Sequence, residues 1–476
     1  MTDAMPKATN VTEAAYEHFA KVDRSVWELD PELPGFMDLY VDRRESDPDP
    51  EQPTIPVFNQ IKHQMLNARG PSKVFLTGQK GSGKSMELRR VLEDSAIQQR
   101  FELVSVIISE RIDIQQHVDI RYLLLVLAAS LADHIVEQRF DQDAGWVDQG
   151  GASLDPWIQH LARLQSPEAP STADDFKLGI KIPLVELSAA LRSDEQIREK
   201  ILKSDAFSVT AVTRLVSDLI VLIGRLAKRD VLLILDDGDK LTDQNTARGI
   251  FIEHAGTLER LPCRAVITFP YWLHFDQRFH AVTTERPVHV LANIKVAHRE
   301  TPQEVLPGAF LFFKTVYSRL VEPGAKLIEP ENEVIAEAVR HSAGIPREFL
   351  RVLQRGFTLA SGLDEPALTL PRLKQAVGEL RRGMIPFTQT RATRQQLERI
   401  RLTWSLDRPE DWVLLDALLV VELSNDKPWY DAHPILRKYV DELLMEHRRR
   451  IGVGIDDADE VERRLLGELL GESGDA

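Results

Sequence analysis

Short apolar runs alternate with longer amphipathic stretches from about residue 57 to residue 296. The runs are rich in Val, Ile and Leu, which is typical of strands buried on both faces of a sheet. The expected strands are Val74–Leu76, Phe101–Ser109, Val231–Asp237, Arg264–Pro270 and Val288–Val296. Helical periodicity fills three stretches between and before them, which are Val57–Asn67, Arg121–Gln138 and Ala206–Lys228. Strands that alternate with helices predict an α/β fold with a doubly wound parallel sheet.

From about Thr301 to Gly383 the pattern becomes helical. Four helices are expected, at Leu306–Leu320, Glu331–Ser342, Pro346–Leu359 and Leu370–Arg382. A different small unit follows, in which helices near Arg394–Ile400 and Trp412–Leu418 precede two short apolar runs and a helix from Pro434 to Glu446. The two runs, Val420–Leu423 and Pro428–Tyr430, flank a turn. This order of elements suits a winged helix-turn-helix, so we expect a helical lid and then a winged-helix domain after the sheet.

These patterns divide the chain into five segments. The segments are an N-terminal arm at 1–54, the sheet domain at 55–300, the helical lid at 301–385, the winged helix at 386–447 and an acidic tail with a frayed end at 448–476. Residues 139–205 are polar and interrupt the sheet domain as an insertion, within which Phe176–Arg192 suggests a hairpin. In the arm, residues 12–20 are helix-like and Phe36–Arg43 is a candidate short strand.

Composition narrows the class of protein. The chain has 476 residues, 43% of them hydrophobic, and a net charge of −15. That acidity argues against a protein that coats nucleic acid over its whole surface, but it leaves room for a local basic patch. The single cysteine, Cys263, excludes an intramolecular disulfide and a cysteine-based zinc site. No run of eighteen apolar residues predicts a membrane span, and we expect a cytoplasmic protein.

The sequence VFLTGQKGSGKS carries the clearest chemistry. Its glycine spacing, G-x-x-x-x-G-K-S, lets a loop turn its N–H groups toward phosphate oxygens at the start of a helix. The expected ligands are ATP or ADP and Mg²⁺. We expect Lys84, as a catalytic residue, to reach the β- and γ-phosphates of ATP, and the Ser85 hydroxyl to ligate Mg²⁺. The expected nucleotide-binding residues of this loop are Gly78, Gln79, Lys80, Gly81, Ser82, Gly83, Lys84, Ser85 and Met86.

The run LLILDD places two acids where a buried strand ends. Asp236 is the candidate to hold Mg²⁺ through water, and Asp237 the candidate catalytic residue that orients or activates the attacking water. The alternative is a simple turn that ends the strand. Asp239 is expected to be a turn or helix-cap residue rather than a ligand.

Three further features lie downstream. Thr268 ends the next strand and either senses the γ-phosphate or is an ordinary strand residue. Arg278 and Arg286 follow it in a loop, as candidate arginines for a neighbouring subunit or as solvated side chains. The sequence HSAGIPRE is either a plain corner between helices or a corner over the adenine, with Arg347 directed toward the phosphates. Pro346 suits the first turn of the helix that starts there.

Together GQKGSGKS, LLILDDGDK, GIPRE and YDAHPILRKYVDEL resemble the STAND class of signalling ATPases, which are relatives of AAA+ and origin-recognition ATPases. The resemblance covers about residues 36–447. It implies that Pro346 packs near the base, that His433 contacts the β-phosphate of ADP, and that Phe36–Arg43 reaches the base. The alternative for His433 is a helix cap or a core residue. STAND proteins usually carry an effector domain before the ATPase and sensor repeats after it, and only short segments flank the core of this sequence. We therefore expect the output or sensing function in the insertion, in the short arms, or in a separate effector or sensor protein.

Two functions compete. The first is a slowly hydrolysing ATPase switch that is closed with ADP and assembles into a homo-oligomer with ATP, in regulation or defence, as the resemblance implies. The alternative is a DNA-acting ATPase that resembles origin-recognition or transposition-regulating proteins and binds DNA through its winged helix. The basic stretch Arg372–Arg401 favours the second function, unless it is only a solvated face. A metabolic kinase or transferase is disfavoured, because no acceptor-site motif is present.

Overall fold

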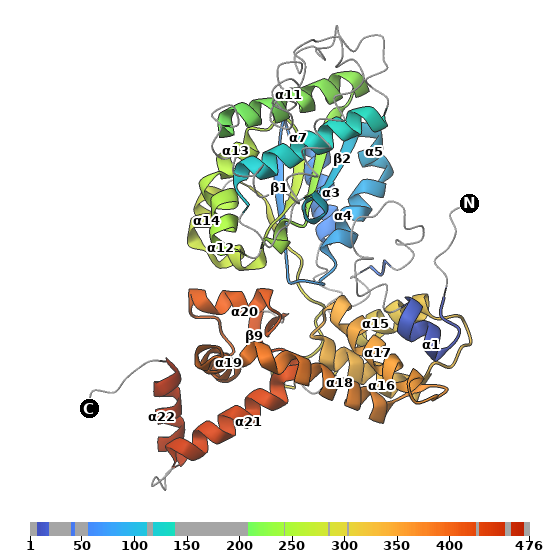
Figure 1. Cartoon of the computed structure of the whole chain (residues 1–476), viewed down its shortest axis with the longest axis vertical. Coiled ribbons are helices and arrows are strands. Elements are labelled where there is room, and N and C mark those ends of the chain that lie inside the picture. The colour runs from blue at the N-terminus through green and yellow to red at the C-terminus, as the bar shows by residue number, and fades with distance from the viewer. Residues whose placement is uncertain are drawn as a thin grey trace, which may run out of the picture. The chain divides into compact units, whose positions relative to one another are not determined.

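The computed structural model describes residues 7–18, 40–42, 56–111, 118–138, 208–241, 243–283, 286–301, 304–424, 428–452 and 458–470 (Figure 1). The chain forms two compact units. We call Val57–Thr77 with Glu87–Val290 the sheet unit, and Met1–Pro56, Gly78–Met86 and Leu291–Ala476 the helical unit. The expected insertion at 139–205, with its hairpin Phe176–Arg192, and most of Phe36–Arg43 lie outside the described residues.

A parallel five-stranded sheet forms the centre of the sheet unit and confirms the expected α/β fold. Its strands are β1 (Lys73–Thr77), β2 (Phe101–Ile107), β3 (Asp230–Asp236), β4 (Arg264–Thr268) and β5 (Val288–Val290). Their order is β2-β3-β4-β1-β5, so the strand that precedes the glycine-rich loop lies between β4 and β5. In β1, β3 and β4 nearly every side chain is buried, as expected of strands covered on both faces.

The last strand is shorter than the apolar pattern predicts. β5 ends at Val290, whereas Val288–Val296 was expected as one strand. The backbone N–H of Ile294 donates instead to the carbonyl of Gly344, at 2.9 Å, in the helical unit. Residues from Leu291 onward therefore pair outside the sheet, which a local apolar pattern cannot distinguish from strand pairing.

Helices of the sheet unit follow the predicted stretches. The longer ones are α3 (Val57–Asn67), α7 (Ile120–Glu137) and α11 (Val209–Ala227). α7 and α11 pack against each other, and side chains around the whole circumference of α7 are buried. The side chains of Asp119 and Ser208 cap the first turns of α7 and α11. The shorter helices are α5 (Ser95–Arg100), α6 (Ile108–Arg111), α12 (Gln244–Arg248), α13 (Ala255–Glu259) and α14 (Gln277–Thr283).

The lid helices of the helical unit agree with the sequence pattern to within a few residues. They are α15 (Pro307–Leu320), α16 (Glu331–Ser342), α17 (Pro346–Ser361) and α18 (Leu370–Met384). The N-terminal arm contributes α1 (Val11–Glu13) and a following helical turn, Ala14–His18, both packed against α17. Ala8 also forms a bridge with Val321. At least this part of the arm is integrated into the lid.

The winged-helix elements occur in the expected order. They are α19 (Arg391–Thr403), α20 (Trp412–Asp416), the antiparallel hairpin β8 (Val420–Ser424) and β9 (Pro428–Ala432), and α21 (Pro434–Ile451). Within the segment expected as an acidic tail, Ala458–Leu470 forms α22, which packs on α19 and α21. Leu465 and Leu469 are buried, because they follow one another at the spacing of one helical face. No helix of the described residues is long and apolar enough to cross a membrane.

Candidate functional site

The glycine-rich loop begins directly after β1 and leads into α4 (Lys84–Glu93). Gly78, Gly81 and Gly83 have positive φ, as the loop geometry predicted from the spacing requires. Lys84 is 5% exposed, and its Nζ donates to the carbonyls of Gly78, at 2.9 Å, and Gln79, at 3.1 Å. The ammonium is thus held inside the curve of the loop, where phosphate oxygens are expected to lie.

The GIPRE corner packs directly on this loop. A Cβ added to Gly81 would lie 2.6 Å from the Cβ of Arg347, and the N–H of Arg347 faces the carbonyl of Gly81 at 3.4 Å. Gly344 has φ +76°, and a Cβ there would lie 1.9 Å from the carbonyl oxygen of Ile294. Only glycine fits at these two close approaches. The corner is therefore more than a connection between α16 and α17, because it is fitted to the phosphate-loop motif.

Arg347 has an unusual environment for an arginine. Its Nε is buried and has no hydrogen-bond partner among the described residues, which also offer it no ion pair. A buried guanidinium nitrogen without an acceptor is costly unless an acceptor arrives. Arg347 contacts Gly81 of the glycine-rich loop, where phosphate is expected. An anionic phosphate group bound there would supply the acceptor that its guanidinium lacks.

Gln79 joins the loop to the winged helix. Its Nε2 donates to the carbonyls of Val420 and Leu415, at 3.0 and 3.5 Å. Its Oε1 accepts from the N–H of Glu422, at 3.0 Å, and from the side-chain amide of Asn293, at 2.6 Å. Asn293 in turn donates to the carbonyl of Glu422 at 3.0 Å. We call Gln79, Asn293 and the β8 edge that they contact the loop–wing contact.

This contact is buried and nearly fully satisfied. Gln79 is 2% exposed and uses both of its amide groups. The two side chains bond the edge of β8, a row of backbone groups that would otherwise need another strand or water. The sequence predicted Gln79 only as one of the nucleotide-binding residues of the loop, and it contained no signal for Asn293.

His433 caps α21, as the alternative expectation for this residue states. Its Nδ1 accepts from the N–H of Ile435 at 3.3 Å, and the side chain is fully buried. Its Nε2 lies 3.6 Å from the carboxylate of Glu348, the last residue of the GIPRE corner. Burial lowers the pKa of His433 to about 3, and Arg351 and Arg437 contribute further. The imidazole is therefore neutral near pH 7.

We expect a pH dependence from this histidine. In the unfolded chain its pKa is about 6.5 and in the folded chain about 3, so folded-state stability is lost as the pH falls from 6.5 toward 3. The largest slope is about 1.4 kcal/mol per pH unit for each such group. His341, whose pKa burial lowers to about 4, should add a similar share.

The test is urea unfolding at pH 6.5 and about pH 5 for the wild type and for His433→Asn. Asparagine is a good N-cap that does not titrate in this range. The variant should lose about a third of the histidine-dependent slope or less, because burial also lowers the pKa of His274, to about 4, and that of His289. Equal slopes in the two proteins would show that His433 is not buried as a neutral group.

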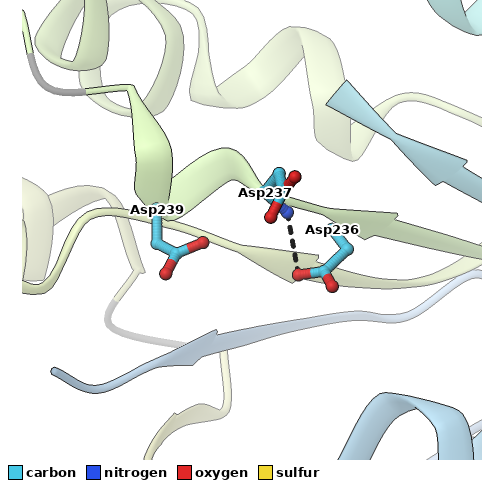
Figure 2. Close-up of side chains that lie close together, drawn as sticks. All are labelled: Asp236, Asp237 and Asp239. Atoms are coloured by element: carbon cyan, nitrogen blue, oxygen red, sulfur yellow. Dashed lines mark hydrogen bonds between the residues drawn. The ribbon is translucent and has the colours of Figure 1, made fainter. Parts of the chain in front are cut away.

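Three carboxylates gather at the end of β3 in the sheet unit. Asp236, Asp237 and Asp239 are buried, and their ligand atoms lie within 4.8 Å of one another (Figure 2). The N–H of Asp237 donates to the carboxylate of Asp236 at 2.8 Å. Asp239 was expected to serve only as a turn or cap, yet its carboxylate belongs to this group. Closely spaced carboxylate oxygens are the ligands that Mg²⁺ prefers.

Asp237 differs from its neighbours. Its backbone is left-handed, with φ 65°, and its carboxylate bonds the Ser109 hydroxyl and the Lys240 ammonium, the latter at 2.8 Å. Burial nevertheless raises the pKa of Asp237 above its usual value. A carboxylate with a raised pKa accepts a proton more readily, as a general base must. Ser109 comes shortly after β2, and Asp237 comes directly after β3. Because β2 and β3 pair in parallel, residues that follow them lie at the same edge of the sheet. The ends of the two expected strands were therefore a usable signal for the contact between Ser109 and Asp237.

The Thr268 hydroxyl makes two hydrogen bonds to backbone groups of the sheet unit. Its hydroxyl accepts from the N–H of Gly238, at 2.9 Å, and donates to the carbonyl of Leu235, at 3.3 Å. The hydroxyl therefore ties β4 to the end of β3 and the turn behind it. A residue that senses the γ-phosphate must donate a hydrogen bond to it. The single proton of the Thr268 hydroxyl is donated to Leu235, so this geometry gives no support to a sensing role.

The candidate arginines of the sequence have carboxylate partners. Arg278 pairs with Asp276 at 2.7 Å, and Arg286 pairs with Glu259. In the basic stretch Arg372–Arg401, Arg399 is 1% exposed and pairs with the buried Asp411, and Arg401 contacts Asp431 and Asp441 at 3.1 and 2.9 Å. The stretch is neither a uniform basic surface nor simply a solvated face, since its charges partly hold the winged helix together.

Comparison with known proteins yields structures only. No protein-family model matches the chain, and no curated protein matches its sequence. Three solved structures cover 85% of this chain at low similarity. They are the Aeropyrum pernix ORC1 protein in complex with DNA (12% identity, 98% of that chain, TM-score 0.36), Drosophila ORC bound to DNA (12%, 91%, 0.32) and Cdc6p from Pyrobaculum aerophilum (11%, 98%, 0.33).

The class that the fold defines is a P-loop α/β sheet followed by a helical lid and a winged helix. The three solved structures are of origin-recognition and Cdc6 proteins, and none of them is a STAND protein. Identities and scores this low carry no argument about what this chain binds or does.

Proposed function

We propose that this chain is an AAA+-type P-loop ATPase in which the bound nucleotide controls the docking of the winged helix. The observation that carries the proposal is the loop–wing contact. Gln79 belongs to the loop that the motif assigns to phosphate binding, and the same side chain holds the β8 edge of the winged helix. A change in the loop on nucleotide binding is thereby coupled to the position of the winged helix.

Each candidate residue has a proposed role. Backbone N–H groups from Gly78 to Met86 would hold the phosphates, with Lys84 on the β- and γ-phosphates and Arg347 as a second cation. Pro346 would pack near the base, and His433 would contact the β-phosphate. Ser85 and Asp236 would hold Mg²⁺, which supplies charge neutralisation of the phosphates when bound. Asp237 would orient the attacking water and accept its proton.

The switch itself depends on differences between nucleotide states. A ligand shifts an equilibrium only by its differential affinity for the two conformations. We propose that ADP favours the docked winged helix, with Gln79 and His433 in the contacts described above, and that ATP favours release and assembly into a homo-oligomer, as in STAND ATPases. A separate effector or sensor protein remains an expectation of that resemblance.

Native mass spectrometry of the purified full chain tests the proposal. We expect co-purified ADP on the monomer and an increase in mass after exchange into ATP and Mg²⁺. A protein that acquires neither nucleotide at millimolar concentration would refute nucleotide binding. A protein that binds both nucleotides yet keeps the same mass and the same winged-helix protection from hydrogen exchange would refute the switch.

Replacing Asp237 with Asn should separate binding from turnover. The amide keeps the shape of the side chain but cannot accept a proton, so ATP binding should persist while hydrolysis falls by about 100-fold or more. Radiolabelled ATP binding and phosphate release measure the two quantities. The matched control is Asp239→Asn in the same cluster, which should keep most of the turnover. Equal losses in the two variants would assign the effect to the cluster rather than to Asp237.

A DNA-acting ATPase is the second candidate, and a cleft on the winged helix favours it. The cleft, of about 630 Å³, lies between α19 and α21 and includes Arg391, Arg394 and Arg450. Glu398 and Glu446 also line it, so the positive charge is partly compensated. DNA binding through this face should weaken steeply with salt and with Arg391→Gln. No duplex binding at low salt would remove this candidate.

A further inference from the structure

A second cavity lies where the lid meets the winged helix, within the helical unit. It has a volume of about 330 Å³ and contains more cationic than acidic residues. Its lining residues are Arg340, His341, Arg381, Arg401, Pro434, Arg437, Lys438, Asp441, Glu442 and Met445. We call it the lid–wing cleft, and it shares no residue with the glycine-rich loop or with the acidic cluster at β3.

Within the ranges that the structure describes, most of its arginines have carboxylate partners, but Arg381 does not. Arg401 contacts Asp441 at 2.9 Å, and Arg437 contacts the buried Asp431 at 2.8 Å. Arg381 has no carboxylate partner among the described residues. Its Nε donates to the carbonyl of Ile435 at 2.7 Å, which fixes the guanidinium at the start of α21. Lys438, which is exposed, likewise has no ion pair in the described part of the chain.

His341 adds an unused polar atom. Its Nδ1 is buried without a hydrogen-bond partner in the described residues, and its Nε2 lies 3.5 Å from Glu337. Burial lowers the pKa of His341 to about 4, and Arg340, Arg381, Arg437 and Lys374 lower it further. These four cations mark an excess of positive charge around the ring. A neutral imidazole has a single N–H, and the Glu337 carboxylate beside Nε2 favours the proton on that nitrogen.

We propose that the lid–wing cleft binds a phosphate-bearing anion. Arg381 supplies a fixed fork of donors that no carboxylate of the described residues occupies, and Lys438 supplies a further cation. Guanidinium groups match phosphate oxygens in geometry and charge. The volume is in the range of small-ligand sites. Because Arg381 belongs to α18 and Lys438 to α21, a bound anion would stabilise the docking of the winged helix on the lid.

The experiment uses the full chain carrying Lys84→Ala, so that binding at the glycine-rich loop does not contribute. Equilibrium dialysis with labelled inorganic pyrophosphate should show one saturable site. Adding Arg381→Gln should weaken it about tenfold, as should Lys438→Gln to a lesser degree. The matched control is Arg382→Gln, the same charge change on the neighbouring, 74% exposed position of α18, which should change affinity by less than about twofold.

Two results would overturn the proposal. One is the absence of saturable pyrophosphate binding in the Lys84→Ala protein. The other is an equal loss with Arg381→Gln and Arg382→Gln, which would indicate general surface attraction.

Lys438→Gln cannot disturb an internal ion pair, so it keeps the test valid if Arg381→Gln unfolds. A short duplex DNA that displaces pyrophosphate would identify the phosphate source as nucleic acid, and failure to displace it would identify a small ligand. Either outcome of the DNA competition requires that pyrophosphate binds in the lid–wing cleft.

Discussion

Lys84→Ala is expected to abolish nucleotide binding while the protein stays folded. The Nζ of Lys84 is buried inside the curve of the loop and bonds two of its carbonyls, so the variant loses the one ammonium that the loop directs inward. Charge-assisted bonds to phosphate are among the strongest available to a side chain. We expect affinity for ADP and ATP to fall by at least about 100-fold, roughly 2.7 kcal/mol.

Isothermal titration and the nucleotide content of the purified protein measure this loss. The matched control is Lys80→Ala in the same loop, where the proposal assigns only the backbone N–H to the phosphates. That variant should bind within about threefold of the wild type. If Lys84→Ala kept its nucleotide, or if both variants lost it equally, the assignment of Lys84 to the phosphates would be wrong.

Gln79→Ala is expected to loosen the winged helix. Alanine leaves the N–H of Glu422 and the carbonyl of Val420 without the partners that Gln79 supplies. Each buried polar group that loses its partner costs about 1–3 kcal/mol. We expect the docked arrangement to lose about 2–3 kcal/mol, and ADP retention to fall with it, because docking and nucleotide binding are linked.

Hydrogen exchange at the backbone amide of Glu422 measures this loss of docking. The amide of Glu422 should exchange about 30-fold faster or more in Gln79→Ala than in the wild type. Gln79→Glu is the harsher variant, since it places a buried carboxylate oxygen against the carbonyls of Val420 and Leu415. Its Glu422 amide should lose at least as much protection as in Gln79→Ala. Unchanged protection of Glu422 in Gln79→Ala would show that the loop–wing contact does not hold the winged helix.

Local patterns were sufficient for most elements of both units. The apolar runs predicted four of the five strands closely, and the helical periodicity predicted the lid helices from α15 to α18. Residues that start or end helices, such as Pro346, affect only the few residues next to them in sequence. Their effects can therefore be predicted from the sequence alone. The same holds for the glycine-rich loop, whose spacing predicted positive φ at Gly78, Gly81 and Gly83.

Patterns failed where a residue's partner lies far away in sequence. β5 ends early because Ile294 bonds Gly344, and α22 forms because its apolar face finds α19 and α21. The basic stretch looked uniform in sequence, yet Arg399 is buried against Asp411 while Arg382 is exposed. Charge in a sequence does not reveal which ion pairs will form, since pairing depends on three-dimensional proximity.

The sequence by itself determined that this chain contains a phosphate-loop motif, a strand that ends in two acids, and helical and winged-helix elements after the sheet. Only the tertiary structure decided that Gln79 and Asn293 bond the edge of β8, that Thr268 serves the turn after β3, and that His433 is a buried cap near Glu348. The physical reason is the range of the interactions. Periodicity, capping and loop geometry involve residues close in sequence, whereas buried hydrogen bonds join groups that only folding brings together.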